Sequence, residues 1–261
     1  MIELTSIWKK LNNIIVLILL KNKRKFNLFE EYIIKIISFW GGDGMTVKEN
    51  SIETLSTIKD GVTLIGVSKT KPVEMIKEAF DGGIRNFGEN KVQDLIAKMD
   101  VLKDYPIKWH FIGHLQKNKV KYLVDRECLI HSIDSVELVR EIEKKYGNKG
   151  RICRGLIQIN IGREESKFGV LKEELYDIIE EVEKSEFIKI EGLMAILPKG
   201  NEEILKKYFK DMKNTFDKLS KESFKNIDMK FLSMGMTNDY LYAMDEGTNM
   251  VRVGRKIFGE R

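Results

Sequence analysis

The sequence is poor in the residues that build metal and disulfide sites. It contains only two cysteines, Cys128 and Cys153, and three histidines in 261 residues. The cysteines lie far apart and form no CxxC pair or Cys/His cluster, and there is no HExxH motif. His110 and His114 have HxxxH spacing, but they lie in and just after a strand-like run and not on one face of a helix. A disulfide framework and a zinc site are therefore not expected, and we predict two structural thiols in a reducing, cytoplasmic environment.

Several common catalytic and nucleotide-binding motifs are also missing. No GxGxxG sequence follows the first strand-like run, and no GxxxxGK[ST] loop occurs anywhere. Dinucleotide-binding and P-loop functions therefore lose their usual support. There is no GxSxG elbow either, and no Ser/His/Asp or Cys/His set can be assembled from the sequence.

Long hydrophobic runs are absent, which bears on the first 44 residues. The longest run there, 14–20, has seven residues, whereas a transmembrane helix needs about twenty. Lysines follow it without a small-x-small cleavage site, so a signal peptide fits poorly, and a peripheral amphipathic anchor is one alternative. Gly41 to Met45 can be encoded by a purine-rich stretch ahead of an ATG codon, which favours translated upstream sequence. We expect an extension over 1–44, either translated upstream sequence or a disordered or helical segment, and one domain over 45–261.

The excess of positive charge is largely local. The net charge is +5, and residues 1–44 carry six lysines and one arginine against four acidic residues, which leaves 38 basic and 36 acidic residues in the remainder. No basic stripe with interleaved aromatic residues stands out after Met45. Nucleic-acid binding is therefore not expected, and neither is a membrane partner.

From Met45 onward, short β-branched runs alternate with amphipathic stretches, after a first helix expected at 46–59. This alternation predicts a parallel sheet, and eight strands favour closure into a single (β/α)8 barrel of the TIM type. Strands are expected at 63–68, 84–87, 109–112, 129–133, 155–161, 189–196, 230–234 and 250–253. Further helices are expected at 72–81, 90–99, 135–146, 172–184 and 202–221.

Polar residues gather where these strands end, which is the functional face of such barrels. Lys69 follows the first strand, where partial desolvation would free its amine to condense with an aldehyde, but the strand alternation does not separate it from Lys71. Ser233, Gly235 and Thr237 follow the seventh strand and are candidates for a phosphate site, with Gly254 after the eighth. Thr237 is equally a plain helix N-cap.

Arg252 shares the inward parity of the eighth strand, and a buried arginine needs an acceptor. The alternative to a functional role is an ion pair with Asp134 or Glu89.

Ten short motifs then occur in order. They are VSKTKP at 67–72, NFGEN at 86–90, WHFIG at 109–113, LQxNK at 115–119, HSID at 131–134, QIN at 158–160, ESKxG at 165–169, EGLM at 191–194, SMGM at 233–236 and MVRVGxxIFG at 250–259. Together they resemble the pyridoxal phosphate homeostasis protein family, the YggS/PROSC type, over essentially the whole of 45–261. Two departures are the segment before Met45 and His114, which stands where other members often have proline.

The resemblance implies a fold-type III barrel that binds pyridoxal 5′-phosphate (PLP), like the N-terminal domain of alanine racemase. It implies that Lys69 holds PLP as a Schiff base, that Arg252 faces the pyridine nitrogen, and that Lys167 lies at the rim. The phosphate would rest mainly on backbone N–H groups, and further residues would line the ring site. The implied cofactor-binding residues are Lys69, Asn90, Asn160, Met194, Ser233, Gly235, Met236, Thr237, Arg252 and Gly254.

The resemblance also implies a monomeric, cytoplasmic carrier or regulator in PLP (vitamin B6) and amino-acid homeostasis, without catalytic residues. Its partners would be PLP and PLP-dependent apo-enzymes. An arginine opposite the ring nitrogen makes PLP a poorer electron sink, and no second domain follows the barrel in this sequence. The alternatives are a small PLP-dependent amino-acid racemase or lyase, and a barrel that no longer binds the cofactor and only contacts partners.

Overall fold

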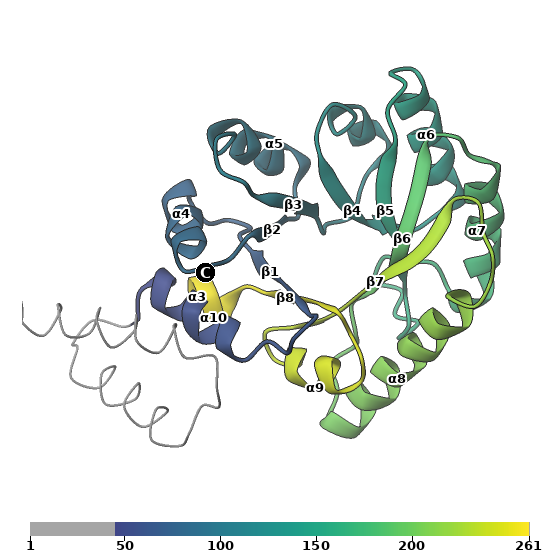
Figure 1. The fold of residues 1–261 in the computed structure, drawn as a ribbon. Helices are drawn as coiled ribbons and strands as arrows, with labels where there is room; N and C mark the ends of the chain where they lie inside the picture. Colours follow the sequence, from purple (N-terminus) through teal and green to yellow (C-terminus); the bar gives the residue numbers. More distant parts are fainter. Residues whose placement is uncertain (1–44, 261) are drawn as a thin grey trace, which may run out of the picture. The chain divides into compact units, whose positions relative to one another are not determined.

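The strands of the computed structural model, which describes residues 45–260, close into a parallel barrel. The order around the barrel is β1 to β8, with β8 paired to β1 (Figure 1). The strands are β1 Thr63–Val67, β2 Asn86–Glu89, β3 Lys108–Phe111, β4 Cys128–Ile133, β5 Cys153–Ile159, β6 Ile188–Ala195, β7 Ile227–Met236 and β8 Met250–Val253.

Helices form an outer layer around these strands (Figure 1). Several of them begin where the local sequence supplies a cap: the Ser135 side chain accepts a hydrogen bond from Leu138 N, and that of Asn201 accepts one from Ile204 N. The elements are α3 Val47–Ser56, α4 Val73–Asp81, α5 Val92–Val101, η1 Lys117–Tyr122, α6 Val136–Gly147, η2 Lys172–Glu174, α7 Leu175–Lys184, α8 Glu202–Leu219, α9 Tyr240–Asp245 and α10 Arg255–Phe258.

The expected barrel and its eight strands are confirmed, with boundaries shifted by a few residues. The six expected helices are also present, although the stretch from Lys172 begins as a short 3-10 turn. The short elements η1 and α10 were not expected, because six and four residues are too few to show a helical period. The helix expected after Thr237 is present as α9, which begins at Tyr240. The predictions for residues 1–44 lie outside the described residues.

Two packing layers hold the barrel. The interior cluster contains Ile65, Leu129, Leu156, Met194 and Met250, while a larger apolar layer fills the space between strands and helices. Both layers are apolar, so their burial drives the closure of the sheet.

The two thiols are unpaired, as expected from the sequence: Cys153 is buried and Cys128 is half-buried. Burial raises the pKa of the Cys128 thiol to about 12 and raises that of Cys153 as well, so neither is a reactive thiolate at neutral pH. Among the described residues, no helix combines the length and apolar character needed to span a membrane.

Candidate functional site

The strand alternation brings most of the candidate residues to the inner face of the barrel. Side chains alternate along a strand, and Met194 and Met250 belong to the interior cluster. By the same parity Ser233, Gly235, Arg252 and Gly254 face inward near the carboxyl ends of β7 and β8, and Asn160 follows β5. Lys69 and Asn90 continue the inward parity just beyond β1 and β2. The carboxyl ends of the strands are therefore the candidate site.

Two lysines near the proposed anchor, Lys71 and Lys167, donate hydrogen bonds within the protein. The Lys71 ammonium donates to three backbone carbonyls at the end of the chain, those of Phe258 at 2.9 Å, Gly259 at 3.3 Å and Glu260 at 2.7 Å. The Lys167 ammonium donates to Leu197 O at 2.8 Å and pairs with Glu164. The amines of Lys71 and Lys167 thus both donate to oxygen atoms of the protein itself.

Lys69 lies in a tight turn that ends β1. Lys71 N donates to Ser68 O at 3.0 Å, which closes a four-residue turn with Lys69 and Thr70 at its centre. Thr70 has a φ of 66°, in the left-handed region that a β-branched residue seldom adopts. This is the third position of the turn, where type II turns favour glycine. The chain therefore accepts local strain next to Lys69.

Replacing Thr70 by glycine should raise the free energy of unfolding by about 0.5–1 kcal/mol. Relief of a left-handed β-branched residue gains about 1–2 kcal/mol, and the greater chain entropy of glycine offsets part of it. Urea denaturation measures the change. Thr63→Gly in β1 is the matched control and should destabilise the protein; a loss of stability in Thr70→Gly would contradict the strain.

A buried ion pair between Glu89, at the end of β2, and Lys98 of α5 supports the same turn. Glu89 is fully buried, and its Oε1 accepts from Lys98 Nζ at 2.6 Å and from the Ser68 hydroxyl at 2.6 Å. Lys98 Nζ also donates to Ser68 O at 2.9 Å. Within the described residues, Glu89 Oε2 is buried without a hydrogen-bond partner. These bonds tie the ends of β1 and β2 to α5 and fix the residue that precedes Lys69.

The ends of β7 and β8 form a narrow polar cradle. Gly235 has a φ of 89°, and a Cβ there would lie 2.6 Å from the Ala243 Cβ, so only glycine fits. Beside it, Met236 N donates to Asp239 Oδ1 at 2.5 Å and Gly254 N donates to Thr237 Oγ1 at 3.2 Å. Both of these backbone N–H groups thus donate to side-chain oxygens of neighbouring residues.

The expectation that Thr237 is a helix N-cap is wrong. The helix α9 begins at Tyr240, its N-cap residue is Asp239, and the Thr237 hydroxyl accepts from the next strand instead. The sequence did not reveal this, because threonine and aspartate are both common at helix starts. Burial raises the pKa of the Asp239 carboxyl. The hydrogen bond from Met236 N and the charge of Arg252 lower it, but burial is the larger effect.

Arg252 is buried and its partners are neutral. Its NH1 donates to Ser233 Oγ at 2.6 Å and its NH2 donates to Ala195 O at 2.8 Å. Neither ion pair considered from the sequence forms, since Asp134 pairs with His114 and Glu89 pairs with Lys98. Burial lowers the pKa of the guanidinium to about 10, although Asp239 acts in the opposite direction. Arg252 therefore remains a cation at neutral pH.

The remaining candidates, Asn90, Asn160 and Met194, differ in burial and in the hydrogen bonds that their side chains make within the described residues. Asn160 uses its side-chain amide within its own loop, because Nδ2 donates to Glu164 O and Lys167 O and Oδ1 accepts from Glu164 N. Met194 is fully buried and pairs in register with Ser233. The Asn90 side chain is half-buried, and no hydrogen bond ties it to another described residue. Asn90 is thus the amide best able to contact a ligand.

His114 is more than a surface residue. Its ring stacks on that of Phe168, with centroids 3.7 Å apart and planes 10° from parallel. Its Nδ1 also lies 3.1 Å from Asp134 Oδ2. His114 therefore joins the segments that follow β3 and β5 at the rim of the site.

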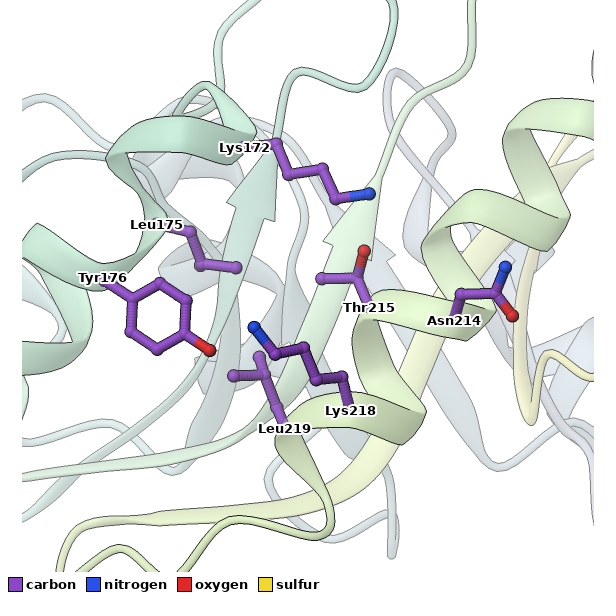
Figure 2. Close-up of a pocket in the computed structure, with 7 residues that line it drawn as sticks. All are labelled: Lys172, Leu175, Tyr176, Asn214, Thr215, Lys218 and Leu219. Carbon is purple, nitrogen blue, oxygen red and sulfur yellow. The ribbon is translucent and has the colours of Figure 1, made fainter.

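Two hollows of the described residues lie away from this site. One, of about 300 Å³, lies between η2 and α7 on one side and α8 on the other; Figure 2 shows the side chains of Tyr176 and Lys218 close together in it. The other, of about 580 Å³, is lined by residues at the amino ends of the strands, including Lys108, His110 and Arg154. Neither hollow is lined by the candidate residues at the carboxyl ends of the strands, so both lie apart from the candidate site.

Sequence reasoning missed the pairing of two histidines. His110 and His131 were recognised only as polar residues of β3 and β4, but their rings meet inside the barrel, with Nδ1 of His110 2.9 Å from Nε2 of His131. The sequence also indicated no role for Lys98 or Asp239. The parity of the strands was the available signal for the histidines, since it points both rings inward.

Comparison with known proteins gives a consistent result. Residues 46–261 match the family described as alanine racemase, N-terminal domain. A pyridoxal phosphate homeostasis protein of Aquifex aeolicus is 42% identical over 199 residues, covering 76% of this chain and 86% of that protein. The pyridoxal phosphate homeostasis protein of Mus musculus is 37% identical over 216 residues, covering 76% of each chain.

Solved structures agree with the fold. PipY of Synechococcus elongatus, solved with PLP bound, is 32% identical with a TM-score of 0.75 and covers 82% of this chain and 100% of its own. Alanine racemase of Clostridium difficile has a TM-score of 0.64 at 17% identity, over 82% of this chain and 59% of its own, which is a likeness of fold alone.

Proposed function

Because this chain belongs to the pyridoxal phosphate homeostasis protein family, with an alanine racemase N-terminal domain, we propose that it binds PLP at the carboxyl ends of its strands. The observation that carries the proposal is the PLP-bound structure of PipY, which is 32% identical and has the same fold. The inward polar residues of this barrel support the same location.

The cradle at the ends of β7 and β8 fits a phosphate group. The Met236 and Gly254 N–H groups now donate to the Asp239 and Thr237 side chains, and a phosphate oxygen would replace these acceptors; Gly235 keeps the cradle free of a side chain. The residues that would hold the phosphate are Ser233, Gly235, Met236, Thr237 and Gly254. The hydroxyl of Ser233 accepts from Arg252 and lies 3.1 Å from His131 Nδ1, so both its acceptor and its hydrogen have partners and any contact from Ser233 to the phosphate would be a backbone contact.

Lys69 would hold the cofactor covalently as a Schiff base. PLP supplies an aldehyde that condenses with a primary amine, and Lys69 stands just after the carboxyl end of β1, at the lysine of the VSKTKP motif that the family resemblance assigns to the anchor. The turn at Thr70 and the Glu89–Lys98 pair hold the backbone on either side of Lys69. Asn90, Asn160 and Met194 would line the ring site.

Arg252 gives this site the character of a carrier and not of a catalyst. As a buried cation opposite the ring nitrogen it would disfavour protonation of that nitrogen, which limits the electron-withdrawing power of the ring. We therefore propose a monomeric, cytoplasmic PLP-binding regulator in vitamin B6 and amino-acid homeostasis, which delivers the cofactor to apo-enzymes. The names of the relatives support this role over a catalytic one.

The proposal is tested by trapping the cofactor. Protein incubated with PLP is reduced with borohydride, digested, and mapped by mass spectrometry. We expect one phosphopyridoxyl group on the peptide that contains Lys69. Labelling chiefly on Lys71 or Lys167 would overturn the assignment of the lysine, and an absence of both labelling and reversible binding would overturn PLP binding itself.

A further inference from the structure

A continuous line of hydrogen bonds crosses the inside of the barrel beneath the proposed site. Asn86 Oδ1 lies 3.2 Å from His110 Nε2, and His110 Nδ1 lies 2.9 Å from His131 Nε2. His131 Nδ1 lies 3.1 Å from Ser233 Oγ, which accepts from Arg252 NH1 at 2.6 Å. The line joins β2, β3, β4, β7 and β8 and ends on the residue proposed to face the cofactor ring.

Only one arrangement of protons satisfies every group in this line. A guanidinium can only donate, so the Ser233 oxygen accepts from Arg252 and its own hydrogen is directed to His131 Nδ1. A neutral His131 then carries its proton on Nε2 and donates to His110 Nδ1, which leaves His110 protonated on Nε2 toward Asn86 Oδ1. The reverse order would direct two donors at Ser233 Oγ and leave its buried hydroxyl hydrogen without an acceptor within this line.

The surroundings keep both imidazoles neutral. Burial lowers the pKa of His110 to about 3, and the charges of Arg154 on β5 and Lys108 on β3 act in the same direction. Burial likewise lowers the pKa of His131, with Arg252 on β8 adding to the effect. Arg252 is the only charged group in the line. Ser233, His131 and His110 can therefore each accept on the side nearer the guanidinium and donate on the side farther from it.

We propose that His131, supported by His110, is a positioning residue that fixes the Ser233 hydroxyl as an acceptor and so holds the Arg252 cation in one orientation toward the cofactor ring. Ser233 then acts on the cofactor through Arg252 and not through a hydroxyl contact to the phosphate. This inference rests on the proposed function for its effect on PLP, but the proton arrangement belongs to the protein alone.

The proton arrangement is tested first, on protein without PLP. Long-range ¹H–¹⁵N NMR distinguishes the two neutral tautomers and the cation, and the chain has only three histidines to assign. His110 and His131 should both be neutral and carry the proton on Nε2 at pH 5, below the ordinary histidine pKa of about 6.5. A proton on Nδ1 of either ring, or a charged ring at that pH, would overturn the inference, whether or not the protein binds PLP.

The effect on the cofactor is tested with Ser233→Ala and Ser233→Thr in PLP-loaded protein. The first removes the hydroxyl and the second keeps it. The pH midpoint of the visible spectrum of bound PLP should shift by about half a unit or more in Ser233→Ala and return toward its original value in Ser233→Thr.

His131→Leu should shift the midpoint in the same direction, while the control Ser185→Ala, which removes a buried hydroxyl bonded to Glu181 O at the end of α7, should not. A folded His131→Leu or Ser233→Ala protein that binds PLP with an unchanged midpoint would reduce the line to a purely structural role. Should either variant fail to fold, the NMR measurement on the unmodified protein decides the matter. Failure of that protein to bind PLP would contradict the proposed function and leave the tautomer result intact.

Discussion

Replacing Lys69 by alanine should remove the visible absorption band of PLP-loaded protein and weaken PLP binding by about 100-fold, equivalent to about 2.7 kcal/mol. The covalent bond to the cofactor is lost, while the backbone cradle at Gly235 and Gly254 stays intact and retains weak affinity for the phosphate. The measurement is a spectroscopic titration with PLP, followed by gel filtration to determine how much cofactor stays bound.

Lys71→Ala and Lys167→Ala are the matched controls. Both remove a lysine near the same site, but in each the amine is already bonded to oxygen atoms, those of Phe258 and Glu260 for Lys71 and that of Leu197 for Lys167. They should keep the absorption band. Full retention of the band in Lys69→Ala, together with its loss in either control, would transfer the anchor to that lysine.

Replacing Lys98 by methionine should lower the free energy of unfolding by about 3–5 kcal/mol. The Lys98 and Glu89 side chains are only 11% and 0% exposed, and the substitution leaves a buried carboxylate whose Oε2 already lacks a partner among the described residues. Urea denaturation followed by circular dichroism measures the change. Because Lys98 also holds Ser68 O, we expect the variant to retain PLP less well.

The exposed pair of Lys59 with Asp245 provides a matched control. It has the same 2.6 Å separation of nitrogen and oxygen, but its side chains are 54% and 57% exposed. Lys59→Met should leave the denaturation midpoint within experimental error, because solvent screens an exposed pair. Equal losses in the two variants would show that burial is not the source of the effect.

The candidate site was predictable to the extent that it depends on strand alternation and on short motifs. The alternation of β and α segments placed Lys69, Asn160 and Arg252 at or just beyond the carboxyl ends of strands, and the structure confirms the strands β1, β5 and β8 themselves. The N-cap alternative for Thr237 was wrong, because α9 is capped at Asp239 and the Thr237 hydroxyl accepts from Gly254 N just after β8. A contact of that kind depends on how β7 and β8 are paired and leaves no local trace in the sequence.

The sequence by itself determined the closed parallel barrel, the family and the group of residues that face inward, since these depend on local periodicity and on motif order. Only the tertiary structure decided which lysine has an amine bound elsewhere, and which partners Arg252 has. The deciding contacts join residues far apart in the chain: 187 positions separate Lys71 from Phe258, and 102 separate His131 from Ser233. Closure of the barrel alone brings such residues within hydrogen-bond distance.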